Sequence, residues 1–156
     1  MPTQFVIRKV SLEYIPDFVF LRRIMFQSMG YNNPDDLNAH DHSATQYLLK
    51  TIPSGEFHGW LATTFDGKNV GSGGVVIDQH PPSPVNLTGK IGYIMSIITL
   101  PEYRGKGIAR QIMEVIIDWL KGQKIQVVEL HATEMGRQLY ASMGFLDTNV
   151  MRMKIA

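Results

Sequence analysis

One segment restricts the fold of this chain more than any other. An apolar run, residues 91–100, leads into a short turn, and the turn leads into a long amphipathic helix. Pro101 ends the run as a strand, because proline cannot donate a hydrogen bond to a sheet. We therefore expect a strand–turn–helix unit whose helix begins near residue 103 or 104. The apolar positions that form one face of a 3.6-residue period are Ile108, Ile112, Val115, Ile116, Trp119 and Leu120.

The turn has the composition of an anion-binding site. The first amides of a helix have no partner within it, and the helix dipole places partial positive charge there. Small residues at every second position leave the backbone open to an anion, and basic residues add charge around it. We expect a pyrophosphate at this helix start. The small residues are Gly105, Gly107 and Ala109, and the basic residues are Arg104, Lys106 and Arg110.

Simpler interpretations of this turn fit less well. A tight turn needs only one glycine, whereas each glycine in a first helical turn costs about 1 kcal/mol relative to alanine. The Walker pattern GxxxxGK[ST] is absent, and the dinucleotide pattern GxGxxG would need a glycine at Arg110.

The other patterns along the chain predict an α/β (α+β) fold with a mixed sheet flanked by four helices, in one domain spanning residues 1–156. The expected order is β-α-α-β-β-β-α-β-α-β. The polar segments 31–38 and 79–90 are expected to be loops, since turn-formers and prolines dominate them. Besides the unit above, strands are expected at 5–7, 57–65, 70–78, 127–131 and 148–155, and helices at 11–29, 39–52 and 134–143.

Composition excludes several classes of function. The net charge is +1, so a nucleic-acid partner is not expected. The chain has no cysteine, which removes disulfides, thiolate metal sites and cysteine nucleophiles. No apolar run is long enough to span a bilayer, and the N-terminus lacks a signal-peptide pattern, so we expect no membrane partner and a cytoplasmic location.

Two motifs together resemble one enzyme family. The run Arg104-Gly105-Lys106-Gly107-Ile108-Ala109 matches the R/Q-x-x-G-x-G/A signature of the GCN5-related N-acetyltransferases, the GNAT superfamily. About forty residues later, Leu139-Tyr140-Ala141-Ser142-Met143-Gly144-Phe145 resembles the second signature, LYxxxGF. The string TEMGRQLY is similar to a bacterial GRPLY-like subgroup, with Gln138 in place of the proline. The resemblance implies a GNAT-like sheet of about six to seven strands.

The resemblance also implies acetyl-CoA as co-substrate, with no metal. The sheet would split between the strands at 91–100 and 127–131, and the pantetheine arm would pair with the backbone of Ile97, Ile98 and Thr99. The pyrophosphate would lie on the amides of Gly105, Lys106, Gly107, Ile108, Ala109 and Arg110. The chain departs from the family at Thr133, where many members have an asparagine, and at Gly136, where alanine is usual.

The implied activity is transfer of the acetyl group to a primary amine of a small molecule or peptide, by direct attack in a ternary complex. Tyr140 holds the position of the family's general acid, and a phenol is protonated at neutral pH and can donate to the leaving thiolate. The alternative is a non-catalytic acyl-CoA-binding or sensor module with the same fold.

The sequence leaves the general base open. Asp78 and His80 end a central strand, while Glu129 and His131 share one face of a later strand. A water deprotonated with no side-chain base is the remaining alternative. The acceptor amine, the use of longer acyl-CoAs and the choice between monomer and homodimer are open as well.

Three further charged or polar segments have simpler interpretations. His40-Asp41-His42 does not place two imidazoles on one helix face, so we expect no metal site there. Asp41 is expected to cap a helix. The pair Arg22-Arg23 is expected to be solvated.

Overall fold

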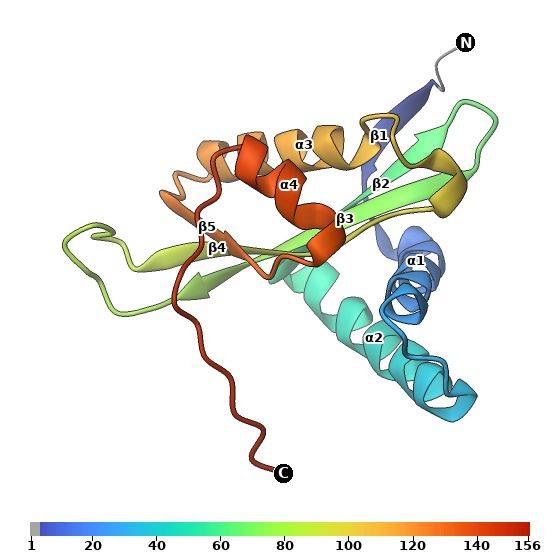
Figure 1. Ribbon diagram of the computed structural model, residues 1–156, viewed down its shortest axis with the longest axis horizontal. Helices are drawn as coiled ribbons and strands as arrows, with labels where there is room; N and C mark the ends of the chain where they lie inside the picture. The colour runs from blue at the N-terminus through green and yellow to red at the C-terminus, as the bar shows by residue number, and fades with distance from the viewer. Residues whose placement is uncertain (1–3) are drawn as a thin grey trace.

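A computed structural model describes residues 4–156, which form one five-stranded sheet with helices on both faces (Figure 1). The strands are Phe5–Lys9 (β1), Phe57–Thr64 (β2), Asn69–Gln79 (β3), Lys90–Thr99 (β4) and Val127–Leu130 (β5). The α-helices are Ile15–Ser28 (α1), Pro34–Ser54 (α2), Ile108–Gly122 (α3) and Glu134–Ser142 (α4), and the short 3₁₀ helices are Leu12–Tyr14 (η1) and Pro101–Tyr103 (η2).

The sheet is mixed, as the sequence predicts. The strand order is β1-β2-β3-β4-β5, and neighbours are antiparallel except for the parallel pair β4–β5. A parallel pair needs a crossover connection, and α3 supplies it. The turn between β2 and β3, which contains Asp66 and Gly67, falls between the strands expected at 57–65 and 70–78, and the loop between β3 and β4 falls within the segment 79–90.

The helices cover opposite faces of the sheet. In Figure 1, α1 and α2 lie below it, while α3 and α4 lie above. The predicted apolar face of α3 packs on the sheet, with Ile108, Ile112, Ile116 and Leu120 buried. Because Gly73 has no side chain, this helix approaches the sheet closely: a Cβ at Gly73 would lie 2.6 Å from the Cγ2 atom of Ile112. Within residues 4–156, no helix combines the length and apolarity needed to cross a membrane.

Three helices begin at residues other than those the sequence predicts. The α-helix expected from residue 11 begins at Ile15, after the 3₁₀ helix η1. The segment 31–38 is only partly a loop: α2 begins at Pro34, because the Asn33 side chain accepts a hydrogen bond from the Asp36 amide. The third helix begins later than expected, at Ile108, because Gly107 adopts a left-handed conformation with φ of 82° immediately before it.

The expected strand at 148–155 is absent, so the sheet has five strands rather than six to seven. The C-terminal residues extend away from the domain (Figure 1). A strand is stable only when its backbone pairs with a neighbour, and the extended tail has none within residues 4–156. The large apolar side chains of the tail are 67–90% exposed; they are Leu146, Val150, Met151, Met153 and Ile155.

We predict that Gly73→Ala destabilises the fold by about 1–3 kcal/mol, because the added methyl group would overlap α3 side chains in a filled core. The measurement is the free energy of unfolding in urea. Gly122→Ala is the control: a Cβ there meets nothing within 4 Å, so stability should stay equal or rise slightly. Equal stability of the Gly73→Ala protein and the wild type would show that α3 can move away at no cost.

Candidate active site

β4 separates from β5 halfway along its length. The two strands pair from Ile91 opposite Val127 to Ile94 opposite Leu130, and the register stops there. The other edge of β4 stays paired with β3 as far as Thr99. In the described part of the chain, the β5-facing edge of residues 95–99 therefore has no strand partner. This is the split that the resemblance implies, and residues 97–99 line it.

A β-bulge at Ser96 marks the point of separation. The three residues of β3 from Ser72 to Gly74 lie opposite four residues of β4, from Met95 to Ile98, and Ser96 has a φ of +61°. Such a conformation costs a non-glycine residue of order 1–3 kcal/mol and needs support from its surroundings. Two side chains supply it: the Ser72 hydroxyl donates to the Ser96 carbonyl at 2.9 Å, and the Arg22 guanidinium donates to the Ser96 hydroxyl.

The glycine turn leaves backbone amides open at the start of α3. Gly105 and Gly107 both have positive φ, and a Cβ on either would point into open space. The first backbone hydrogen bond of the helix runs from the Gln111 amide to the Gly107 carbonyl at 3.1 Å. Among residues 4–156, the amides of residues 107–110 have no backbone acceptor. An anion could bind to these amides without displacing a backbone hydrogen bond of the described residues.

The three basic residues of the turn are held in different ways. The Arg104 Nε atom donates to the Thr99 carbonyl at 3.1 Å, which ties the turn to the end of β4. Arg110 donates to the Ser142 hydroxyl at 2.7 Å and links α3 to α4. The Lys106 ammonium lies 5.5 Å from the centre of the Tyr103 ring. All three cations belong to the segment that carries the open amides, and each has a defined contact with the protein.

Tyr140 lies near the end of α4, and its buried ring extends back over the first turn of the helix, against Gly136. It is 8% exposed, and a Cβ at Gly136 would lie 3.0 Å from its hydroxyl oxygen, so the missing side chain makes room for the ring. Burial raises the pKa of Tyr140, which keeps the phenol protonated at neutral pH. Thr133 caps α4 by accepting from the Gly136 amide at 3.2 Å, so its side chain has a structural task.

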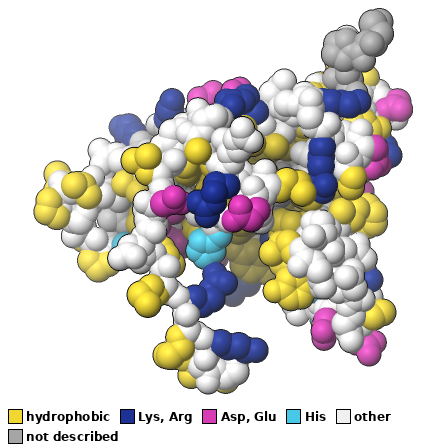
Figure 2. All heavy atoms as spheres, viewed as in Figure 1, with side chains coloured by type: hydrophobic (Ala, Val, Ile, Leu, Met, Phe, Trp, Pro, Cys, Tyr) yellow, Lys and Arg dark blue, Asp and Glu magenta, His cyan; other side chains and the backbone are white. Residues whose placement is uncertain are grey.

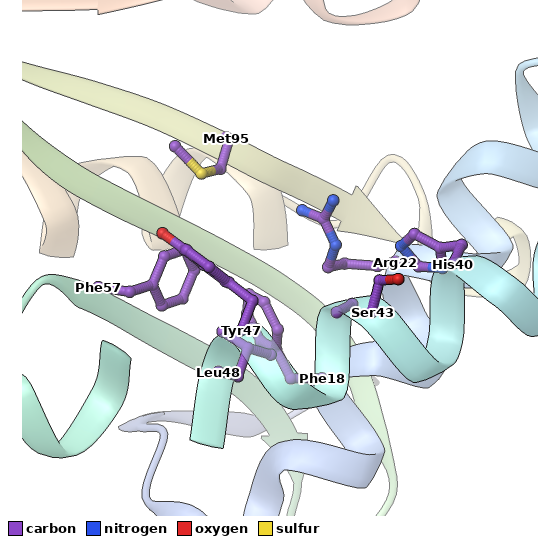
Figure 3. A pocket seen from close by; sticks show the side chains of 9 residues that line it. Phe18, Arg22, His40, Ser43, Tyr47, Leu48, Phe57 and Met95 are labelled. Atoms are coloured by element: carbon purple, nitrogen blue, oxygen red, sulfur yellow. The ribbon is translucent and has the colours of Figure 1, made fainter. Parts of the chain in front are cut away.

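A pocket of about 370 Å³ opens on the α1–α2 face of the sheet, beside the bulge. Figure 3 shows the Arg22 guanidinium and the Tyr47 hydroxyl pointing toward β4, where Met95 lies. On the surface view, this side of the molecule is hollowed between α1–α2 and a group of charged and histidine side chains near the junction of β5 and α4 (Figure 2). The remaining lining residues are Phe18, His40, Ser43, Ala44, Leu48 and Phe57.

Two buried polar side-chain atoms lack a hydrogen-bond partner within residues 4–156, one near the glycine turn and one in the pocket. One is Oγ1 of Thr99, at the end of the split, and the other is Nε2 of His40, in the pocket lining. Buried polar groups are normally paired, so each atom indicates a place where a ligand group could bind. Arg22, His40 and Ser96 are the functional candidates that our sequence reasoning missed.

Three of the four candidate bases surround Tyr93, and the fourth does not. Glu129 is the β5 partner of Tyr93, and the His131 ring lies 5.3 Å from the Tyr93 ring. Burial raises the pKa of Tyr93; the nearby Arg152 lowers it, while the charges of Asp78 and Glu129 add to the rise. His80 lies beyond β3 and is exposed. Tyr93 and Met95 are two residues apart, so this group shares a sheet face with the pocket.

The structure corrects two interpretations of charged residues. Asp41 caps no helix; it lies inside α2, where it accepts from Arg23 at 2.6 Å and contacts His40 at 3.0 Å. Arg22 is half-buried rather than solvated, four residues from the buried Phe18 on the same face of α1. The sequence contains a signal for this: Arg22 follows Phe18 by four residues, which places the cation on the apolar face of the helix. Within residues 4–156, no group of three or more histidine or acidic side chains could hold a metal ion.

Comparisons with known proteins agree with this architecture. Residues 22–145 match the model of the acetyltransferase (GNAT) family. A predicted acetyltransferase from Clostridium acetobutylicum, solved with acetyl-CoA, is 25% identical, with a TM-score of 0.89 and 97% of each chain covered. A GCN5-related N-acetyltransferase from Ralstonia eutropha JMP134 is 27% identical, with a TM-score of 0.88, covering 97% of this chain and 99% of that one.

A more distant structure shares the fold. Glucosamine-6-phosphate N-acetyltransferase from Arabidopsis thaliana is 18% identical, with a TM-score of 0.73 and 97% of each chain covered. No curated protein sequence matches the chain. The family match spans most of the sequence and includes the glycine turn, the split strands and Tyr140. The chain therefore belongs to the acetyltransferase (GNAT) family.

Proposed function

We propose that this protein binds acetyl-CoA as co-substrate and transfers its acetyl group to a primary amine held in the pocket beside Ser96. The observation that carries the proposal is the continuity of three features along β4: the open amides after it, the free edge of residues 95–99, and the pocket at Met95. A long cofactor and a small acceptor could therefore meet at the bulge from opposite sides.

The residues present fit the parts of acetyl-CoA. The open amides at 107–110 and the cations around them suit a pyrophosphate. The unpaired edge of β4 suits the amide groups of a pantetheine arm, which can bind as an added strand does. The buried, unpartnered Thr99 hydroxyl lies between these two places and would gain a partner from the ligand.

The reaction needs two proton transfers. The neutral amine attacks the thioester carbonyl carbon, a carbon–nitrogen bond forms, and the carbon–sulfur bond breaks. One amine proton passes to a base, and the leaving thiolate takes a proton. Tyr140 is the proposed donor, since its raised pKa keeps it protonated. Glu129 is our first choice of base, acting directly or through water, because it is less exposed than Asp78 and adjoins Tyr93 on the pocket face.

We expect Gly107→Asp to weaken acetyl-CoA binding at least about tenfold, because a carboxylate would project from the turn where the pyrophosphate is proposed to lie. Gly107→Asn is the matched control: it has the same shape and the same strain at positive φ but no charge. Calorimetry measures both. Equal affinities of the Asp and Asn proteins would place the pyrophosphate elsewhere.

Tyr140→Phe should lower kcat about 10- to 1000-fold and leave acetyl-CoA affinity nearly unchanged, because only the hydroxyl is lost and the packed ring remains. Steady-state kinetics with calorimetry on the same preparations separates the two quantities. Wild-type kcat in the Phe variant would leave Tyr140 as a packing residue.

The base can be identified from pH profiles measured at subsaturating acceptor. We expect Glu129→Gln to lower kcat/KM about 100-fold near neutral pH and to flatten the lower limb of the profile, since the amine would then lose its proton without help. His80→Gln, at an exposed position outside the Tyr93 group, should keep the wild-type profile. Asp78→Asn and His131→Gln belong in the same series. If Glu129→Gln keeps the wild-type profile, Glu129 is not the base; if all four variants do, no side chain among them is.

The sensor alternative makes a different prediction for the whole protein. A non-catalytic module would bind acetyl-CoA with the same dependence on Gly107 and release no CoA with any amine. A panel of primary amines, including small molecules and lysine peptides, tests this directly.

A further inference from the structure

Arg22 projects from a helix face that is otherwise apolar. It lies four residues after Phe18 and four before Phe26 on α1, and its guanidinium is 5.4 Å from the centre of the Phe26 ring. The guanidinium donates to the Ser96 hydroxyl, so its position is fixed at the bulge of β4. Figure 3 shows it reaching across the pocket from α1 toward β4. A cation is therefore held where the acceptor is proposed to bind.

This cation has no acidic partner in the described part of the chain. None of the ion pairs within residues 4–156 includes Arg22. Its neighbour Arg23 differs, because it contacts the Asp41 carboxylate at 2.6 Å and the Asn38 side chain at 3.1 Å. Burial lowers the pKa of Arg22, with Tyr47 opposing the shift, but a guanidinium stays charged at neutral pH. A half-buried charge without a counterion is costly, so an anion would be favoured here.

The rest of the pocket is apolar and aromatic. Phe18, Leu48 and Phe57 are buried in its wall, and Tyr47 and Met95 complete it. His40 adds one polar atom, Nε2, which is buried without a partner, while its Nδ1 atom is engaged by Asp41. A volume of about 370 Å³ suits a small molecule. The lining thus offers one fixed positive charge, the buried Nε2 atom of His40, the hydroxyls of Ser43 and Tyr47, and apolar walls.

We propose that the acceptor is an amine with a carboxylate or similar planar anionic group a few bonds from its nitrogen and an apolar body, as in an apolar α-amino acid. The proposal rests on the proposed acetyl transfer. The anionic group would bind to Arg22, whose planar fork suits a carboxylate. The short spacing follows because the guanidinium already contacts Ser96, at the bulge where the amine must attack.

The same arrangement would help the chemistry. A positive charge beside the bound amine disfavours its protonated form, so more of the amine is neutral and able to attack. An acceptor with a second positive charge in place of the anion would meet Arg22 unfavourably. Arg22 would then select the substrate and also prepare it.

The test compares acceptors that differ only in charge: alanine, leucine and phenylalanine, each as the free acid and as the carboxamide. For wild-type protein we expect the acid-to-amide ratio of kcat/KM to be high, and Arg22→Gln should reduce it roughly 10- to 100-fold. The amines of the acids and of the amides differ in basicity, but this difference is the same for both proteins. It therefore cancels when the acid-to-amide ratio of the wild type is compared with that of Arg22→Gln. Arg22→Lys should retain part of the preference. Phenylalanine should exceed alanine as an acceptor because of the apolar walls.

Arg23→Gln is the matched control, since it removes a cation from the next position on α1 and should leave the ratio unchanged. Acetyl-CoA affinity and thermal unfolding of each variant check the fold. Equal losses with acids and amides in Arg22→Gln would make Arg22 a brace for the bulge or a group acting on the thioester, and would overturn this inference alone. Transfer to neutral or cationic amines with no preference for acids would do the same. Failure with every amine, despite acetyl-CoA binding, would overturn the proposed function as well.

Discussion

The bulge at Ser96 is the constraint on which the candidate site depends. The bulge lies where β4 stops pairing with β5, and in the described part of the chain the edge of residues 95–99 beyond that point has no strand partner. The extra residue changes which face each side chain takes: Met95 lines the pocket on the α1–α2 face, whereas Ile97 approaches Gly73 beneath α3. The bulge requires Ser96 to adopt a left-handed backbone conformation, which is unfavourable for a residue with a side chain. Hydrogen bonds from Ser72 of β3 and Arg22 of α1 stabilise it. One irregular residue therefore connects the strand split, the pocket and α1.

The two halves of the site are built by different means. The cofactor half uses backbone: open amides after Gly107 and the free edge of β4, with cations held at the side by Thr99 and Ser142. Under the proposed function, such a surface would bind a pyrophosphate and an amide chain through backbone groups and not through particular side chains. The acceptor half uses side chains from α1, α2, β2 and β4, so its specificity can change without disturbing the cofactor half. This division would allow proteins of the same fold to bind the same cofactor and to differ in the acceptor that they bind.

The sequence predicts the sheet, the crossover helix and the glycine turn because each depends on local signals: a period of 3.6, a proline stop, and glycines where φ must be positive. It does not predict the bulge, since Ser96 carries no residue-type signal for a left-handed conformation. The strand expected at 148–155 does not form, because residue types can favour an extended segment but do not supply the neighbouring strand that it must pair with. The sequence does not distinguish Arg22 from its neighbour Arg23, whereas the helix directs one toward Ser96 and the other toward Asp41. The roles of Tyr140 and of the candidate bases stay predictions.

A crystal structure of the protein with CoA would test the central claim most directly. The account predicts the pyrophosphate on the amides of residues 107–110, the pantetheine arm along β4 at residues 97–99, and the sulfur between the bulge and the Tyr140 hydroxyl, facing the Arg22 pocket. A CoA molecule bound with its pyrophosphate away from the Gly107 turn, or with its sulfur on the α3 side and out of reach of that pocket, would contradict it.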